Sequence, residues 1–220
     1  MHCLLIAATA FEIAPFIESA RKRHHLYDAE ISPDILITGV GLVASTYAIT
    51  KHLSIKKPGI IIQAGIGGCF DKNIPLSSVV AIRQDRVADL GVIENNNWKT
   101  LFDLGFAKPG RTPYSNGWLI NRSGLLKTVK LPKVTGISVN EISTSPKKIK
   151  FITEKFNPVV ESLEGAALHH VAISENIPFV QLRAMSNYIG ERNKKKWQLK
   201  QAIKNLDEEL KKLLQSLNPV

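Results

Sequence analysis

The sequence contains little cysteine and no long apolar run. Its two cysteines, Cys3 and Cys69, form neither a C-x-x-C pair nor a cysteine–histidine pattern at metal-ligand spacing, so we expect reduced thiols and no bound metal. No window approaches the roughly 18 apolar residues of a membrane span. The apolar N-terminal stretch has no basic segment and ends at Glu12, which argues against a signal peptide. We therefore expect a cytoplasmic protein without a membrane partner.

Acidic residues are scarce relative to basic ones. There are 29 Lys and Arg against 19 Asp and Glu, a net charge of +10, and six basic residues without an acidic one lie between Arg192 and Lys204. Nucleic-acid binding would need aromatic residues among them or a known motif, and only Trp197 is present. We favour a solvated basic face and no nucleic-acid partner; a nucleic-acid patch and a pocket for a substrate carboxylate are the alternatives.

The remaining composition is that of an ordinary globular protein, with 44% hydrophobic residues, 22% charged residues and a mean hydropathy of −0.02. A chain of 220 residues can bury one core, and this one shows neither an internal repeat nor a linker. We therefore expect a single domain that covers residues 1–220.

Short apolar runs typical of strands alternate with amphipathic stretches typical of helices. The expected strands are 3–8, 35–38, 60–63, 79–83, 134–139, 159–163 and 179–184, and the expected helices are 11–20, 42–53, 166–175 and 197–217. This alternation predicts an α/β fold, a three-layer α/β/α domain with a central mixed, mostly parallel sheet. The leucine spacing of the last helix predicts one stripe packed on the domain. Residues 91–132 are the least regular part and predict an excursion or a lid.

Two glycine motifs follow expected strands. Gly39-Val40-Gly41-Leu42-Val43-Ala44 matches the G-x-G-x-x-A fingerprint of dinucleotide binding, which also needs an acidic residue about 20 positions later. No Asp or Glu occurs between Asp34 and Asp71, which excludes a nicotinamide cofactor. The second motif, Ala64-Gly65-Ile66-Gly67-Gly68, is interpreted as a turn after the strand 60–63. Two such turns predict a ligand across the carboxyl edge of the sheet.

Three polar residues follow expected strands and are the candidate functional side chains. Glu12 comes just after the first strand, Glu164 follows the sixth and opens a helix, and Asn187 follows the last. Either glutamate alone could merely complement a helix dipole, but side chains at strand ends of one sheet can converge on one cleft. His169 and His170 point to different sides of a helix and are expected in the core or on the surface.

Taken in order, these motifs resemble those of the nucleoside phosphorylase/nucleosidase superfamily, and most of all its bacterial nucleosidases that cleave methylthioadenosine and adenosylhomocysteine. Two further stretches, 88–91 and 186–192, are similar to the branch that hydrolyses futalosine, a nucleoside of menaquinone biosynthesis, and releases hypoxanthine. The segments that carry the superfamily resemblance are 7–12, 38–41, 65–68, 161–167 and 183–187.

The resemblance implies a purine nucleosidase without metal or cofactor that forms at least a homodimer, in which a neighbouring subunit closes the end of the pocket. It implies that Glu12 positions and deprotonates the attacking water, that Glu164 binds the ribose 2′- and 3′-hydroxyls, and that Leu163 packs under the sugar. The partner is then a small-molecule purine nucleoside. The residues expected to line its sugar and base are Gly65, Ile66 and Gly67.

Asn187 departs from the adenine-specific nucleosidases, which carry at this position an aspartate that protonates purine N7. Breaking the glycosidic bond leaves negative charge on the purine. An asparagine amide can donate to a 6-oxo group while its oxygen accepts from a protonated N7, which suits hypoxanthine. A flipped amide could face adenine, so an adenine substrate stays an alternative. The proton must come from water or from a substrate tautomer.

Water is the expected nucleophile, because phosphate needs a cationic site and neither glycine motif has an adjacent Arg or Lys. Arg83 and Arg86 are the nearest candidates, so a 6-oxopurine phosphorylase is a rival hypothesis. Futalosine carries a benzoate at the far end of its sugar chain, and Arg192 with the lysines after it is the expected cationic partner. A non-catalytic purine sensor is a further alternative, since Asn187 lacks the usual acid.

Overall fold

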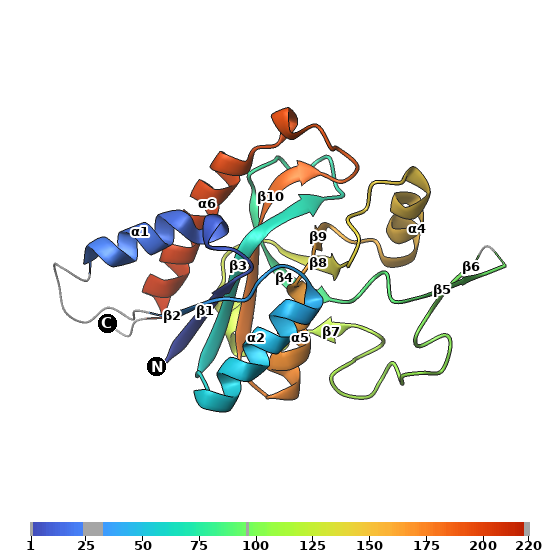
Figure 1. Ribbon diagram of the computed structural model, residues 1–220, viewed down its shortest axis with the longest axis horizontal. Helices are drawn as coiled ribbons and strands as arrows, with labels where there is room; N and C mark the ends of the chain where they lie inside the picture. Colours follow the sequence, from blue (N-terminus) through green and yellow to red (C-terminus); the bar gives the residue numbers. More distant parts are fainter. Residues whose placement is uncertain (1, 24–32, 96, 218–220) are drawn as a thin grey trace.

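The computed structural model describes residues 2–23, 33–95 and 97–217, in which helices cover both faces of a central sheet (Figure 1). Helices α1 (Ala14–Arg23) and α6 (Leu199–Ser216) lie on one face, and α2 (Leu42–Ile55) and α5 (Gly165–Ser174) lie on the other. None of the helices in these described ranges is both long and apolar enough to cross a membrane.

The sheet has the strand order β10-β4-β8-β9-β3-β1-β2, with the short β7 paired to β4. Because β10 also pairs with β3, the strands from β10 to β3 close into a ring that β1 and β2 extend. Most pairings are parallel; β10–β4, β3–β9 and β4–β7 are antiparallel. The predicted three-layer fold with a mixed, mostly parallel sheet is confirmed. The strands are β1 (Cys3–Ala7), β2 (Asp34–Ile37), β3 (Ile60–Cys69), β4 (Val79–Asp85), β7 (Leu119–Ile120), β8 (Lys133–Ser138), β9 (Val160–Ser162) and β10 (Phe179–Tyr188).

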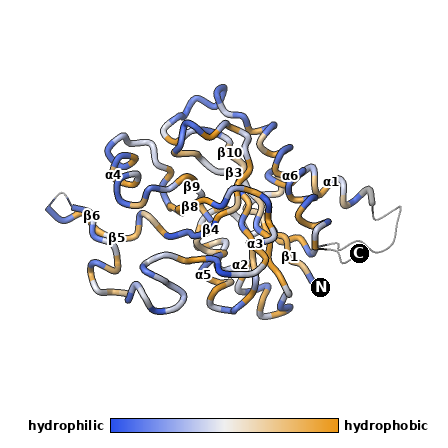
Figure 2. Tube along the Cα trace, turned by 180° about the vertical axis from the view of Figure 1, so that it is seen from behind, coloured by the Kyte–Doolittle hydropathy of each residue, from blue (hydrophilic) through white to orange (hydrophobic). Residues whose placement is uncertain are grey.

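Apolar side chains fill the spaces between the sheet and its helices, and Figure 2 shows the strands as the most hydrophobic part of the trace. Leu5 of β1 joins the cluster under α1 and α6, whereas its neighbour Leu4 joins the cluster under α2 and α5, because successive strand residues face opposite sides. Cys3 and Cys69 are both buried and unpaired. The predicted apolar stripe of α6 is confirmed; its buried members are Ala202, Ile203, Leu206, Leu210, Leu213 and Leu214.

Two strands run further than the sequence analysis suggested. We expected β3 to stop at Gln63 and the glycines to form a turn, but the strand continues to Cys69. The expectation that the last strand ends at Ala184 is likewise wrong, because β10 continues to Tyr188 and holds Asn187 within it. The two strands stay paired in parallel over this stretch, so each provides the hydrogen-bonding partner that keeps the other extended.

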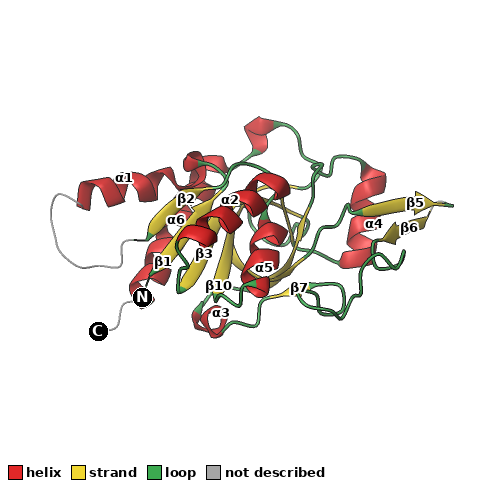
Figure 3. Cartoon of the chain, turned by 60° about the horizontal axis from the view of Figure 1, so that its bottom comes forward, coloured by secondary structure: helices red, strands yellow, loops and turns green. Residues whose placement is uncertain are grey.

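Residues 91–132 form an excursion from the sheet, as predicted, but they are more regular than expected. β5 (Gly91–Glu94) and β6 (Asn97–Thr100) pair into a hairpin that projects from the end of the molecule opposite α1 (Figures 1 and 3). The buried guanidinium of Arg86 anchors this part, because it lies over the rings of Trp118 and Phe156, 4.3 Å from the centroid of Phe156. Two further helices that we did not predict are α3 (Gly124–Thr128) and α4 (Pro146–Phe156).

Candidate active site

Glu12 lies where the chain leaves β1, in the short 3-10 helix η1 (Ala10–Ile13), and only 7% of it is exposed. Its Oε2 accepts hydrogen bonds from the amide of Thr9, at 3.1 Å, and from the Thr9 hydroxyl, at 3.2 Å. Its Oε1 accepts from the amide of Ile66 in β3, at 3.0 Å. Donors from the segment after β1 and from β3 thus fix the carboxylate at the carboxyl edge of β1.

Gly65 leaves room for a buried arginine beside this carboxylate. A Cβ at position 65 would collide with Nη1 of Arg183 and lie 2.9 Å from Oε1 of Glu12, so both groups occupy the space that a side chain would need. Arg183 pairs with Gly65 across β10 and β3, and its Nη1 donates to the carbonyl oxygen of Ile66 at 3.3 Å. Gly65 therefore lies in a strand, where its missing side chain lets charged groups pack closely. The turn that we predicted for this glycine is wrong.

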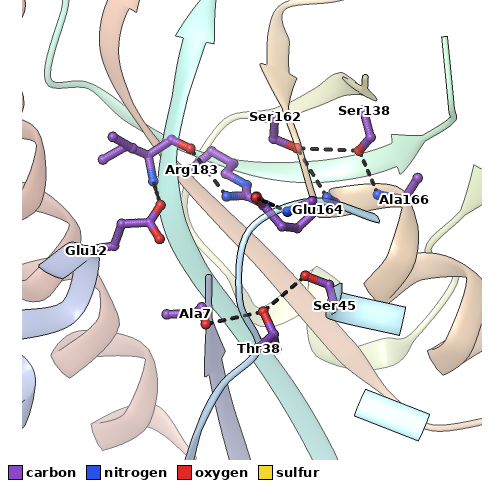
Figure 4. A network of polar contacts seen from close by, with 12 residues as sticks. Ala7, Glu12, Thr38, Ser45, Ser138, Ser162, Glu164, Ala166 and Arg183 are labelled. Carbon is purple, nitrogen blue, oxygen red and sulfur yellow. Dashed lines mark hydrogen bonds and ion pairs between the residues drawn. The ribbon is translucent and has the colours of Figure 1, made fainter. Parts of the chain in front are cut away.

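Glu164 approaches the same arginine from the other side (Figure 4). It is the N-cap residue of α5, and its Oε2 lies 3.6 Å from Nη2 of Arg183. Its Oε1 accepts from the amide of Gly41 at 3.1 Å, so the glycine fingerprint before α2 directs its free N–H to a carboxylate. Burial raises the pKa of Glu164, while the Arg183 charge and the Gly41 N–H lower it; the nearby Glu12 raises it further.

Hydroxyl groups hold the loops around this cluster (Figure 4). The Ser138 hydroxyl accepts from the amide of Ala166 at 2.7 Å, and the Ser162 hydroxyl accepts from the amide of Gly165 at 3.2 Å, which satisfies the first turn of α5. Thr38 bonds to the carbonyl oxygen of Ala7 and to the hydroxyl of Ser45, which joins the loop before α2 to β1. These hydrogen bonds therefore fix the two loops that carry Gly41 and Glu164.

Asn187 lies on the same pair of strands, four residues after Arg183 in β10. The register shifts between Met185 and Asn187, so Asn187 pairs with Gly68, three residues after the Gly65 that pairs with Arg183. Three strand residues span about 10 Å. The Asn187 Oδ1 accepts from the Ser186 hydroxyl at 2.8 Å, and its Nδ2 donates to the carbonyl oxygen of Tyr188 at 3.0 Å. These two neighbours thus orient the amide.

The other predicted site residues are more dispersed. Ile66 provides the amide for Glu12 and the carbonyl for Arg183, and the Gly67 carbonyl accepts from the Ser186 hydroxyl at 3.3 Å. Leu163 is half-buried against the apolar cluster beneath α4. Arg192 is exposed beyond β10, its guanidinium 5.6 Å from the ring of Trp197, and its role in substrate binding stays a prediction.

Arg183 stands in the segment 183–187 that carries the superfamily resemblance, but we predicted no role for it from the sequence. The signal was present: Arg183 alternates with Leu182 and Ala184 in a strand whose neighbours are apolar, and a charged residue buried there needs a partner. Its ion-pair partner Glu164 and the nearby Glu12 come from other segments of the chain, so their proximity to Arg183 appears only in three dimensions. Of the core and surface positions left open for His169, the structure shows the core: the residue is fully buried, and its Nδ1 contacts the Leu119 carbonyl oxygen at 2.8 Å.

Nearly the whole chain, including every residue of this cluster, matches one family model. Residues 4–218 match the phosphorylase superfamily. The chain belongs to that superfamily. The resemblance inferred from the motifs is confirmed, and with it the expectation of an enzyme of this superfamily.

Curated relatives of this superfamily member include hydrolases of two kinds. A futalosine hydrolase of Streptomyces coelicolor is 26% identical over 97% of this chain and 95% of its own length, and one of Thermus thermophilus is 25% identical over 81% and 80%. A 5′-methylthioadenosine/S-adenosylhomocysteine nucleosidase of Bacillus licheniformis is 24% identical over 84% and 81%. These names agree with the expectation of an N-glycosyl hydrolase.

Solved structures of the superfamily share the fold. The native futalosine hydrolase of Helicobacter pylori strain 26695 superposes with a TM-score of 0.79 at 18% identity, covering 99% of this chain and 98% of that one. A mutant methylthioadenosine nucleosidase of the same organism, with 5′-methylthioadenosine in its active site, gives 0.78 at 18% identity over 98% and 99%. Within the described part of this chain, no three His, Cys, Asp or Glu side chains are grouped to hold a metal ion.

Proposed function

We propose that residues 1–220 act as one nucleosidase domain that hydrolyses the N-glycosidic bond of futalosine, releasing hypoxanthine and dehypoxanthine futalosine in menaquinone biosynthesis. The futalosine hydrolases among the relatives support this substrate, since one of them aligns along almost its whole length. The two buried, unpaired thiols fit a cytoplasmic location.

The convergence of Glu12, Glu164 and Arg183 around Gly65, with Asn187 about 10 Å along the same strands, carries this proposal. Glu164 accepts the ribose hydroxyls and so holds the sugar between itself and Glu12. Glu12 accepts a proton from the water whose oxygen bonds to C1′. The bond from C1′ to the purine nitrogen breaks, and its electron pair leaves with the base.

Water is a better nucleophile here than phosphate. The site does contain one cation that the sequence analysis overlooked, Arg183, but the Glu12 and Glu164 carboxylates flank it, so two negative charges oppose one positive charge. A phosphate dianion would be repelled by this arrangement, whereas neutral water would not. Of the other candidates, Arg86 is buried under aromatic rings and Arg83 is exposed on β4.

Asn187 binds the leaving base in this proposal. Its amide donates to the 6-oxo group, where negative charge accumulates as the bond breaks, and the proton that completes hypoxanthine arrives from water. Arg192 and the lysines after it bind the benzoate in this proposal. The Gln198 amide donates to the Ser186 carbonyl oxygen at 2.9 Å, which returns this segment to the end of β10 and supports the assignment. Figure 2 shows the segment between β10 and α6 as strongly hydrophilic.

We further propose that the enzyme is a homodimer. The large apolar side chains Phe11, Val40, Val43 and Tyr47 are exposed by 56% to 83%, and they come from the elements that carry Glu12 and Gly41. Large exposed apolar side chains beside a site are typical of an interaction surface, and a second copy would close the pocket in this proposal. In light scattering, Val43→Glu should yield a monomer; an unchanged mass for the variant, or a monomeric wild type, would contradict the dimer.

A methylthioadenosine/adenosylhomocysteine nucleosidase is the second candidate, because relatives with that name align over most of the chain. The test is incubation of the purified protein with futalosine, inosine and methylthioadenosine in phosphate-free buffer. We expect hypoxanthine from futalosine. Consumption of methylthioadenosine alone would favour the second candidate, and dependence on added phosphate would favour a phosphorylase. Salt-sensitive binding of generic DNA or RNA without any turnover would favour nucleic-acid binding by the segment 192–204.

A further inference from the structure

Asp85 is a fully buried carboxyl group near Arg183 that the mechanism above does not use. Its Oδ1 accepts hydrogen bonds from the amide of Arg86 at 2.7 Å and from the Ser138 hydroxyl at 3.0 Å. Its Oδ2 has no hydrogen-bond partner among the residues that the structure describes. A polar atom left alone in the interior costs free energy, so the groups beside Oδ2 decide whether it carries a proton.

Gln181 lies beside that oxygen, in the space that Gly165 leaves free. A Cβ on Gly165, in the first turn of α5, would collide with Asp85 Oδ2 and with the Gln181 Nε2. Gln181 precedes Arg183 by two residues in β10, so both side chains leave the same face of the strand. The Gln181 amide therefore lies between the Asp85 carboxyl group and the sheet face that carries the catalytic cluster.

His169 is the third member of this buried group, and it follows Gly165 by four residues on the same face of α5. Gln181 makes no fully formed hydrogen bond within the described part of the chain, but it is close enough to influence the pKa of both His169 and Asp85. The His169 Nδ1 contacts the carbonyl oxygen of Leu119, which can only accept, so Nδ1 carries a hydrogen. Burial lowers the pKa of His169 to about 4, so near pH 7 its ring is neutral and Nε2 is an acceptor.

Two orientations of the Gln181 amide compete in this group. With its nitrogen toward Asp85, as the structure shows it, Gln181 donates to an ionised Asp85 and its oxygen accepts from a charged His169. A half-turn of the amide presents its NH2 group to the neutral His169 Nε2 and its oxygen to Asp85 Oδ2. Two oxygens can bond only if one carries a hydrogen, so Asp85 is then a protonated donor. The second orientation places no charge on either buried group and is therefore favoured.

We propose that Asp85 is a positioning residue for the reaction and that it works in its protonated form. As a neutral acid it donates to Gln181 and leaves the whole charge of Arg183 to the two catalytic glutamates. Once ionised, it would compete with Glu164 for the guanidinium, because Nη2 and the Glu164 Oε2 are 3.6 Å apart and not in close contact. The arginine would then shift toward Asp85, and the carboxylate that binds the ribose would lose its orientation. The inference rests on the proposed roles of Glu12 and Glu164, but not on which nucleoside is hydrolysed.

The surroundings of Asp85 set the pH at which this change occurs. Burial raises the pKa of Asp85 to about 7, although the Ser138 hydrogen bond and the charge of Arg183 lower it. Of the elements packed around Asp85, β10 contributes Arg183, α5 contributes His169 and Glu164, and β8 contributes the uncharged Ser138. Two catalytic carboxylates already share the one guanidinium, so a third negative charge is disfavoured there. We therefore expect Asp85 to release its proton only above about pH 7.

The first experiment measures kcat/KM against pH with whichever nucleoside the protein hydrolyses. The wild-type value should fall about tenfold between about pH 6 and 8.5, because Asp85 ionises in this range. In Asp85→Asn the side chain stays neutral and its NH2 group still donates to Gln181, so the ratio of kcat/KM at the higher pH to that at the lower should be near 1. Asp34→Asn, at the exposed ion pair with Lys56, is the matched control and should keep the wild-type fall. A wild-type profile that is flat over this range, or the same fall in Asp85→Asn, would overturn the inference.

NMR of the wild-type protein, labelled with ¹³C at the aspartate carboxyl groups and with ¹⁵N in the histidine rings, tests the network without a variant or turnover. We expect an aspartate carboxyl signal that titrates near pH 7, well above Asp34, whose hydrogen bonds from Lys56 and His2 lower its pKa. At about pH 6 the His169 ring should be neutral, with its hydrogen on Nδ1. Aspartate signals that are all ionised at this pH, or hydrogens on both nitrogens of His169, would contradict the inference. Hydrolysis of no nucleoside at any pH would instead refute the proposed function.

Discussion

At the scale of single residues, the site depends on how Arg183 is neutralised. The guanidinium is 1% exposed, and Glu164 and Glu12 are the carboxylates beside it. A buried charge without partners would be costly, so the three groups form one unit. The chemistry assigned to each glutamate then depends on the arginine as well as on its own position.

Glu12→Gln should abolish turnover while substrate binding stays measurable. The amide keeps the shape of the carboxylate but cannot accept a proton from water, so kcat should fall by about 10²- to 10⁴-fold. Steady-state assays with futalosine, together with calorimetric titration of the variant, measure the two effects separately. Unchanged turnover would remove Glu12 from the mechanism.

Arg183 should control the pH dependence of ribose binding. Glu164 must be ionised to accept two hydroxyl hydrogens, and burial raises its pKa, whereas Arg183 lowers it. The value of kcat/KM should therefore fall as the pH drops through the raised pKa. Arg183→Gln removes the lowering charge, so the acid limb of the profile should move to higher pH.

Arg183→Lys keeps the charge and is the matched control for this shift. Its acid limb should stay closer to that of the wild type. Identical profiles for the Gln and Lys variants would show that the charge at position 183 does not influence the group that titrates.

At the scale of elements, β3 and β10 show what the sequence could and could not predict. The apolar runs and the alternation of strands and helices located the layers, and the motifs located Glu12, Glu164 and Asn187 near one sheet edge. We predicted a turn for the glycines of β3, because glycine usually weakens a strand. In this strand the space that a Cβ would need at Gly65 is filled by Arg183 and Glu12, which the sequence alone does not show. The register that places Arg183 opposite Gly65 depends on strand pairing, which a single sequence does not contain.

Gly65→Ala tests the packing role of glycine within β3. The added methyl group would displace the Arg183 guanidinium and the Glu12 carboxylate, so kcat/KM should drop by about 10²-fold. Gly124→Ala, in the first turn of α3, meets nothing within 4 Å and is the control. The control should keep full activity and gain a little stability. Similar activity in both variants would mean that the space at Gly65 is not needed.

At the scale of the whole molecule, buried titratable groups couple folding to pH. Burial raises the pKa of Asp85 to about 7, against the hydrogen bonds from Ser138 and the Arg86 amide and the charge of Arg183, which lower it. Burial lowers the pKa of His169 to about 4. Between about pH 4 and 7 the folded protein holds a proton on Asp85 that the unfolded chain has released, so this residue makes stability fall as the pH rises. His169 has the opposite effect between about pH 4 and 6.5.

Asp85→Asn should isolate the first effect. We subtract the free energy of unfolding of the wild type from that of the variant. This difference should rise by about 2–4 kcal/mol in total as the pH increases from 4 to 7. Urea denaturation at a series of pH values measures it. Asp34→Asn, at the exposed ion pair with Lys56, should show no comparable rise. A flat difference for Asp85→Asn would mean that Asp85 is ionised in the folded protein at pH 4 and above.

The most direct test of the account is a crystal structure of the Glu12→Gln variant with intact futalosine. We predict both ribose hydroxyls within hydrogen-bond distance of the Glu164 carboxylate, the base beside Asn187, and the anomeric carbon facing position 12. A nucleoside bound away from Glu164, or a base turned away from Asn187, would contradict it.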